Sequence, residues 1–120
     1  MEGAKRLMKK ILLILSIFIM CGCTNTYKTI DKEETLKLID DKDAVLIDVR
    51  STLEYKQGHI NGAKSYPVTT IINDIKEDYE KDTYLIVYCQ SGSRSKTAAQ
   101  ELMELGYENV YDLGSINNWN

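Results

Sequence analysis

One of the three cysteines, Cys89, directly follows the apolar run Tyr84–Tyr88 and precedes a short loop, Gln90–Ser93, that leads to Arg94. Such a run is typical of a strand buried in a parallel sheet, and ligands of open α/β sheets bind beyond the carboxyl ends of strands. The residues after the loop have the pattern of a helix. A helix N-terminus favours negative charge, and therefore a thiolate over a thiol. The pattern predicts a nucleophilic cysteine in a cradle for anions.

The loop residues suit anion binding. Gly92 allows a bend that a side chain would block, and the small Ser91 and Ser93 let backbone N–H groups approach a ligand. Arg94 adds a permanent positive charge with a planar fork of donors. We therefore expect the substrate to contact Gln90, Ser91, Gly92, Ser93 and Arg94. The alternative is a plain Gly/Ser turn that only joins a strand to a helix.

A second apolar run, Ala44–Asp48, predicts another buried strand whose end lies at the same sheet edge as Cys89. We expect Asp48 to form a structural ion pair and Arg50 to line the substrate pocket. His59, the one histidine, is interpreted as a loop anchor, because an activated thiolate needs no general base. Glu54 is expected to cap a short helix or to pair with a neighbour.

Strand and helix patterns alternate along the chain after residue 28. Strands or extended segments are predicted near residues 29–30, 44–48, 63–67, 84–88 and 109–113, and helices near 31–41, 51–57, 69–79 and 95–105. Alternation of this kind indicates an α/β fold. We expect a parallel sheet of about four to five strands with helices on both faces.

The N-terminal segment has the pattern of an export signal. Basic residues precede the ten-residue segment Ile11–Met20, in which Ser16 is the one polar residue. Ten helical residues span roughly 15 Å, about half of a membrane's hydrocarbon core. Cleavage is therefore favoured over a transmembrane helix, and also over a buried N-terminal helix, because polar residues follow at once.

The segment Met20-Cys21-Gly22-Cys23 resembles a bacterial lipobox, in which a small residue precedes the cysteine that is lipidated. The resemblance implies a lipid anchor on Cys23. The chain then divides into a signal peptide, a tether and a domain, over residues 1–22, 23–28 and 29–120. We expect export and anchoring at the outer face of the bacterial cytoplasmic membrane, or a periplasmic or outer-membrane location. An ordinary secretory signal with a soluble product is the alternative.

Composition narrows the classes of function. The 120 residues, 43% hydrophobic and 28% charged, fit one globular domain. The formal net charge of −3 argues against a nucleic-acid partner. One histidine and three scattered cysteines do not supply a usual zinc site, so no metal is expected. Nothing in the sequence calls for a dimer, and we expect a monomer.

Three ordered segments resemble the signatures of the rhodanese family and cover nearly all of the domain. The matching segments are Leu46–Arg50 with Glu54–Ala63, the loop and helix Tyr88–Ala99, and the closing segment Leu105–Trp119. The chain departs from the family pattern where Pro, Asn and Gly are frequent, at Asn61, Ser65 and Ser115.

The resemblance implies the rhodanese fold and sulfur transfer. Cys89 would take the sulfane sulfur of thiosulfate, a persulfide or a polysulfide, and then pass it to a thiol, a thiol protein or cyanide. Arg94 would steer a small anionic donor, and the N–H groups of the loop would stabilise the persulfide anion. The chemistry requires no cofactor.

Two other functions stay open. Phosphatases and arsenate reductases of the same fold use a longer loop, with one more residue between cysteine and arginine than the four found here. A non-enzymatic persulfide carrier or thiol sensor would use the same activated thiol.

Overall fold

The computed structural model of the protein describes residues 26–120. The predicted signal peptide, the lipobox and Cys23 lie outside the described residues. Within residues 26–120, no helix combines the length and the apolar character needed to cross a membrane.

The described chain alternates strands and helices, as its sequence predicts. The strands are β1 (Lys28–Thr29), β2 (Val45–Asp48), β3 (Lys64–Ser65), β4 (Tyr84–Cys89) and β5 (Asn109–Ser115). The helices are α2 (Lys32–Lys42), α3 (Thr52–Gln57), α4 (Ile71–Asp78) and α5 (Ser93–Glu104), followed by the short 3₁₀ helix η1 (Ile116–Trp119). All pairings in the five-stranded sheet are parallel, and its order is β1-β5-β4-β2-β3.

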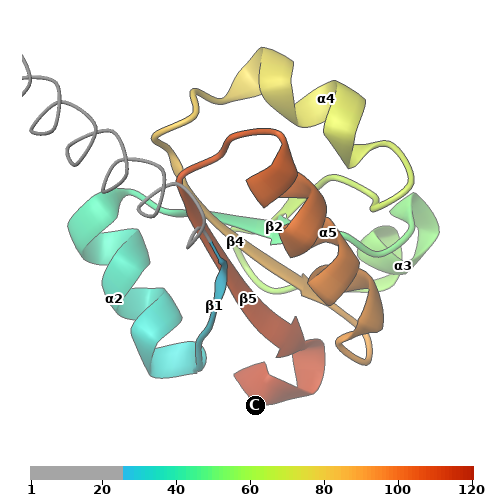
Figure 1. The fold of residues 1–120 in the computed structure, drawn as a ribbon. Helices are drawn as coiled ribbons and strands as arrows, with labels where there is room; N and C mark the ends of the chain where they lie inside the picture. Colours follow the sequence, from blue (N-terminus) through green and yellow to red (C-terminus); the bar gives the residue numbers. More distant parts are fainter. Residues whose placement is uncertain (1–25) are drawn as a thin grey trace, which may run out of the picture.

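Helices cover both faces of the sheet, which confirms the predicted α/β architecture (Figure 1). Alternate side chains of β4 face opposite ways, because successive side chains of a strand point to opposite faces. Leu85, Val87 and Cys89 pack in the cluster that includes α4 and α5. Ile86 and Tyr88 pack in the second cluster, on the side of α2. The side chain of Cys89 therefore points to the face covered by α5.

Local sequence signals set the ends of the helices. Asp31 caps α2 by accepting a hydrogen bond from the N–H of Glu34, as predicted. Ser51 and Glu54 form a complete capping box at the start of α3. The helix α5 begins at Ser93 rather than near residue 95, so the loop after β4 is shorter than the sequence pattern suggested.

An irregularity between β4 and β5 determines which residue lies opposite Cys89. Val87 pairs with Asp112, but the next residue, Tyr88, pairs with Gly114. Leu113 is thus an extra residue in β5, a β-bulge that shifts the pairing by one position. As a result, Ser115 lies in register with Cys89 at the end of the sheet.

Candidate active site

Cys89 is the last residue of β4 and is fully buried. The backbone N–H of Gly92 donates a hydrogen bond to its sulfur, with a distance of 3.0 Å between N and Sγ. The loop thus folds back over the sulfur and presents a backbone donor to it. A donor in this position stabilises negative charge on sulfur, because a hydrogen bond to an ionised acceptor is stronger than one to a neutral acceptor.

The loop reverses direction at Gly92, whose φ of +101° is in the range that favours glycine. Gly92 is also the N-cap of α5 and offers no side-chain acceptor to the first turn. The first N–H groups of a helix have no partner within the helix. The arrangement therefore provides backbone donors and a helix N-terminus at the loop that carries Cys89, as the sequence predicts.

The end of β5 holds the loop from the other side. The hydroxyl of Ser115 donates to the carbonyl oxygen of Gln90 at 2.6 Å, and it accepts from the N–H of Asn117 at 3.1 Å. Sequence reasoning noted Ser115 only as a departure from the family pattern and missed this contact. The signal was the hydroxyl itself, which a glycine at this position would lack.

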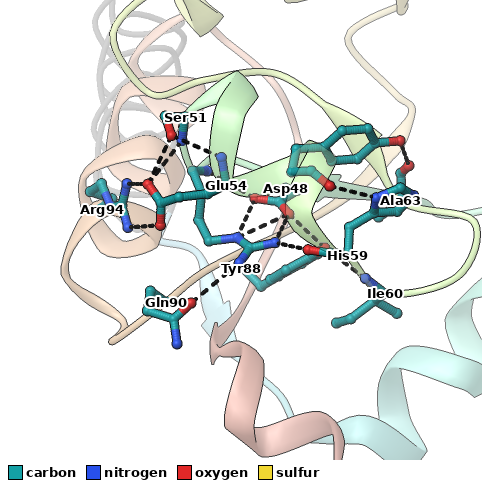
Figure 2. A network of polar contacts seen from close by, with 12 residues as sticks. Asp48, Ser51, Glu54, His59, Ile60, Ala63, Tyr88, Gln90 and Arg94 are labelled. Carbon is teal, nitrogen blue, oxygen red and sulfur yellow. Dashed lines mark hydrogen bonds and ion pairs between the residues drawn. The ribbon is translucent and has the colours of Figure 1, made fainter.

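Arg94 lies in the first turn of α5 and forms a two-pronged ion pair with Glu54 of α3 (Figure 2). Its Nη1 and Nη2 donate to Oε1 and Oε2 of Glu54 at 2.7 and 3.0 Å. The hydrogen bonds from Arg94, together with those from Ser51, lower the pKa of Glu54 from 4.5 to about 2. Glu54 therefore both caps α3 and binds a residue distant in sequence.

The predicted ion pair of Asp48 is present and buried. Nη2 of Arg50 lies 2.6 Å from Oδ2 of Asp48, and this hydrogen-bonded contact raises the pKa of the guanidinium. The same nitrogen donates to the carbonyl of Gly58 at 2.7 Å, and Nη1 donates to Oε1 of Gln90 at 3.2 Å. Arg50 thus reaches the loop through the Gln90 side chain. Its proposed contact with substrate stays a prediction.

His59 lies in a loop contact, as interpreted from the sequence. Its Nδ1 is 2.9 Å from the carbonyl oxygen of Tyr55. The two rings stack with centroids 3.7 Å apart and planes 6° apart. The Tyr55 hydroxyl in turn donates to the carbonyl of Ala63 at 2.7 Å. These contacts fix the segment between α3 and β3.

The remaining predicted loop residues have exposed side chains: Gln90, Ser91 and Ser93. A pocket of about 460 Å³ lies elsewhere, between residues 26–27 and α5, and no residue of the loop lines it. Among residues 26–120, no group of three or more His, Cys, Asp or Glu side chains is placed to hold a metal ion.

Comparisons with known proteins give consistent matches. Residues 31–120 match the family model described as a rhodanese-like domain. The thiosulfate sulfurtransferase GlpE of Pseudoalteromonas translucida is 35% identical over 94 residues, which cover 78% of this chain and 89% of that protein. A putative mitochondrial thiosulfate sulfurtransferase of Schizosaccharomyces pombe is 42% identical over 83 residues, 58% of each chain. The structure of the human single-domain sulfurtransferase TSTD1 superimposes with a TM-score of 0.69 at 27% identity, covering 76% of this chain and 93% of that one.

Proposed function

The chain belongs to the rhodanese family and is a thiosulfate sulfurtransferase-like rhodanese domain, and on this basis we propose that Cys89 carries the transferred sulfur as a persulfide. The donor is a small anionic compound such as thiosulfate, a persulfide or a polysulfide. The acceptor is a thiol, on a small molecule or on a protein, or cyanide in the test tube. The domain works as an exported, lipid-anchored monomer.

The proposed reaction has two substitutions at sulfur. In the first, the Cys89 thiolate attacks the outer sulfur of thiosulfate, the bond between the two sulfur atoms of thiosulfate breaks, and sulfite leaves with the electron pair. The product is the Cys89 persulfide anion. In the second, an acceptor thiolate attacks the outer sulfur of this persulfide and releases the Cys89 thiolate. Two half-reactions of this kind predict ping-pong kinetics.

The observation that carries the proposal is the contact between the Gly92 N–H and the sulfur of Cys89. The loop after Cys89 brings this backbone donor to the sulfur, where negative charge is present in every state of the cycle. Preorganised backbone donors stabilise such charge without rearranging during the reaction. In this proposal Gln90, Ser91, Gly92 and Ser93 bind the donor through their backbone, while Arg94 and Arg50 lie near the loop, each paired with a carboxylate.

The competing functions are less well supported. The four residues between Cys89 and Arg94 make a shorter loop than that of phosphatases and arsenate reductases of this fold. Two of the relatives, from Pseudoalteromonas translucida and Schizosaccharomyces pombe, are named as thiosulfate sulfurtransferases, the second as putative. A persulfide carrier or sensor differs from an enzyme only in turnover with an acceptor, so turnover must be measured directly.

The test is the intact mass of the purified protein before and after thiosulfate. We expect a gain of about 32 Da, one sulfur atom, that cyanide or a thiol reverses. A Cys89→Ser variant should show no gain, while repeated release of sulfite in the presence of a thiol distinguishes an enzyme from a carrier. No gain in the wild-type protein with thiosulfate, a persulfide or a polysulfide overturns the proposal.

The proposed anchor at Cys23 has its own test. When the full chain is made in a bacterium supplied with labelled palmitate, we expect label on the wild-type protein and recovery in the membrane fraction. Cys23→Ser should abolish the label, whereas the neighbouring Cys21→Ser should retain it. Equal labelling of the Cys23→Ser variant, or an unlabelled wild-type protein, contradicts the anchor.

A further inference from the structure

The cation nearest in sequence to the reactive loop is already bound by a carboxylate. Arg94 donates to both oxygens of Glu54, at 2.7 and 3.0 Å, while the N–H and the hydroxyl of Ser51 hold Oε1 of Glu54 from the other side at 3.3 and 3.0 Å. Figure 2 shows Glu54 between Ser51 and Arg94. Glu54, in α3, is therefore held by Ser51 at the start of the same helix and by Arg94 of α5.

Charges around the loop cancel in pairs. Arg94 is matched by Glu54, and Arg50 is matched by Asp48, which is buried and 2.6 Å away. What attracts an anion to Cys89 is then mainly the backbone N–H groups and the N-terminus of α5. The attraction of an anion to these partial charges falls off over a short distance. It is weaker than the attraction that an unpaired arginine would exert.

The ion pair at the loop is also open to solvent and to ligand. The side chains of Arg94 and Glu54 are 37% and 31% exposed. Because Arg94 lies in the first turn of the helix that follows the Cys89 loop, a donor bound at this loop is influenced by the carboxylate as well as by the guanidinium. Each further negative charge on the donor increases both its attraction to Arg94 and its repulsion from Glu54, since the energy between two charges is proportional to their product. The pair therefore gives a doubly charged donor no advantage.

We propose that Glu54 is a specificity-determining residue that, by neutralising Arg94, removes the preference for doubly charged donors that a free arginine would give the site, and so lets singly charged or neutral sulfane sulfur compounds compete. The inference rests on the proposed function of Cys89. It concerns the charge class of the donor: thiosulfate remains a substrate, but its second negative charge gives it no advantage over organic persulfides and thiosulfonates.

The first experiment compares two donors that differ in charge. Thiosulfate carries two negative charges, and methanethiosulfonate, in which a methyl group replaces one oxygen, carries one. Attack of the Cys89 thiolate on either donor gives the same persulfide and releases sulfite or methanesulfinate. The ratio of kcat/KM for thiosulfate to kcat/KM for methanethiosulfonate isolates the effect of donor charge.

Glu54→Gln is the informative variant because glutamine at this position still completes a capping box with Ser51. We expect the ratio of kcat/KM for thiosulfate to that for methanethiosulfonate to rise about three- to tenfold, because the positive charge of Arg94 next to the loop is no longer neutralised. The double variant Glu54→Gln with Arg94→Gln, in which both charges are gone, should return the ratio toward the wild-type value. Glu108→Gln makes the same change in net charge at an exposed site near the opposite end of the sheet and should leave the ratio unchanged.

A second experiment needs no sulfur transfer. Iodoacetate and iodoacetamide alkylate a thiolate in the same way, forming a carbon–sulfur bond and releasing iodide, but only iodoacetate is charged. The ratio of their rates at Cys89, measured on the peptide that carries it in the full chain, reports the local potential. Burial of the sulfur affects the wild-type protein and Glu54→Gln in the same way, so its effect cancels when their ratios are compared. We expect Glu54→Gln to raise the ratio of iodoacetate to iodoacetamide about two- to fivefold.

The outcomes separate the two proposals. If no persulfide forms but Glu54→Gln raises the alkylation ratio, the proposed function fails and the effect of Glu54 on charge stands. If the persulfide forms and neither ratio changes in Glu54→Gln, the role of Glu54 is overturned. A change equal for both donors, or a double variant that does not reverse the single one, shows a distorted loop and likewise overturns it.

Discussion

Asp48 and Tyr88 lie opposite each other on the adjacent strands β2 and β4, and the Tyr88 hydroxyl donates to Oδ2 of Asp48 at 2.9 Å. Tyr88 is the residue before Cys89, so this contact holds the end of β4. The same hydroxyl accepts from the N–H of Ile60 at 3.1 Å, and Asp48 binds Arg50. A buried polar network therefore lies directly behind the reactive loop, on the opposite face of the sheet from α5.

We predict that Tyr88→Phe lowers the free energy of unfolding by about 1–3 kcal/mol, because it leaves the buried N–H of Ile60 without an acceptor. Denaturant unfolding measures the change. Tyr111→Phe is the matched control, since no hydrogen bond of the Tyr111 hydroxyl occurs among the described residues. Equal losses in the two variants would show that the hydrogen bonds of the Tyr88 hydroxyl do not contribute to stability.

Removing the charge of Asp48 should lower the free energy of unfolding more than Tyr88→Phe does. Asp48→Asn leaves the guanidinium of Arg50 buried without its counter-charge, and breaking a buried ion pair on one side typically costs about 3–5 kcal/mol. Urea unfolding at neutral pH measures this loss. The double variant with Arg50→Met, which removes the buried charge as well, should recover part of the stability; no recovery would contradict the ion-pair explanation.

The hydrogen bond from Ser115 to Gln90 should affect the rate of persulfide formation more than the stability. Ser115→Ala removes a bond worth about 1 kcal/mol, which corresponds to roughly a fivefold loss of rate if the bond is needed to shape the loop. Stopped-flow measurement of the half-reaction with thiosulfate tests this. Ser115→Thr keeps a hydroxyl and should keep most of the rate; identical rates for the alanine and threonine variants would argue against the contact.

The ion pair between Glu54 and Arg94 should break only at a pH well below 4.5, the ordinary pKa of a glutamate. The pKa of Glu54 is lowered from 4.5 to about 2, so its ionised form is favoured by folding. The resulting stabilisation is complete above pH 4.5 and is lost as the pH falls toward 2. A carboxyl NMR titration should place the midpoint of Glu54 near 2, and Glu54→Gln should flatten the dependence of stability on pH in this window. A midpoint near 4.5 would mean that the pair does not persist in solution.

Much of this arrangement could be predicted from the sequence because it depends on local patterns. The order of elements, the place of Cys89 at the end of a buried strand, the Asp48 ion pair and the cap at Ser51 follow from periodicity and short spacings. The contact between Glu54 and Arg94 joins residues 40 positions apart. It depends on how α3 and α5 are placed by the whole sheet, which no local pattern encodes. The Ser115 contact is similar, since it requires the bulge at Leu113 that brings Ser115 opposite Cys89.

The pairing of β1 with β5 determines which parts of the fold form last during synthesis. Lys28 pairs with Tyr111, so the first strand of the described chain has no neighbour until the last strand has been synthesised. The same last strand ends at Ser115, which holds the Gln90 carbonyl. While the polypeptide is still growing, the edge of the sheet is therefore unfilled and the loop around Cys89 lacks one of its supports. The sheet is completed, and the reactive loop takes its final shape, only after these same C-terminal residues have been synthesised.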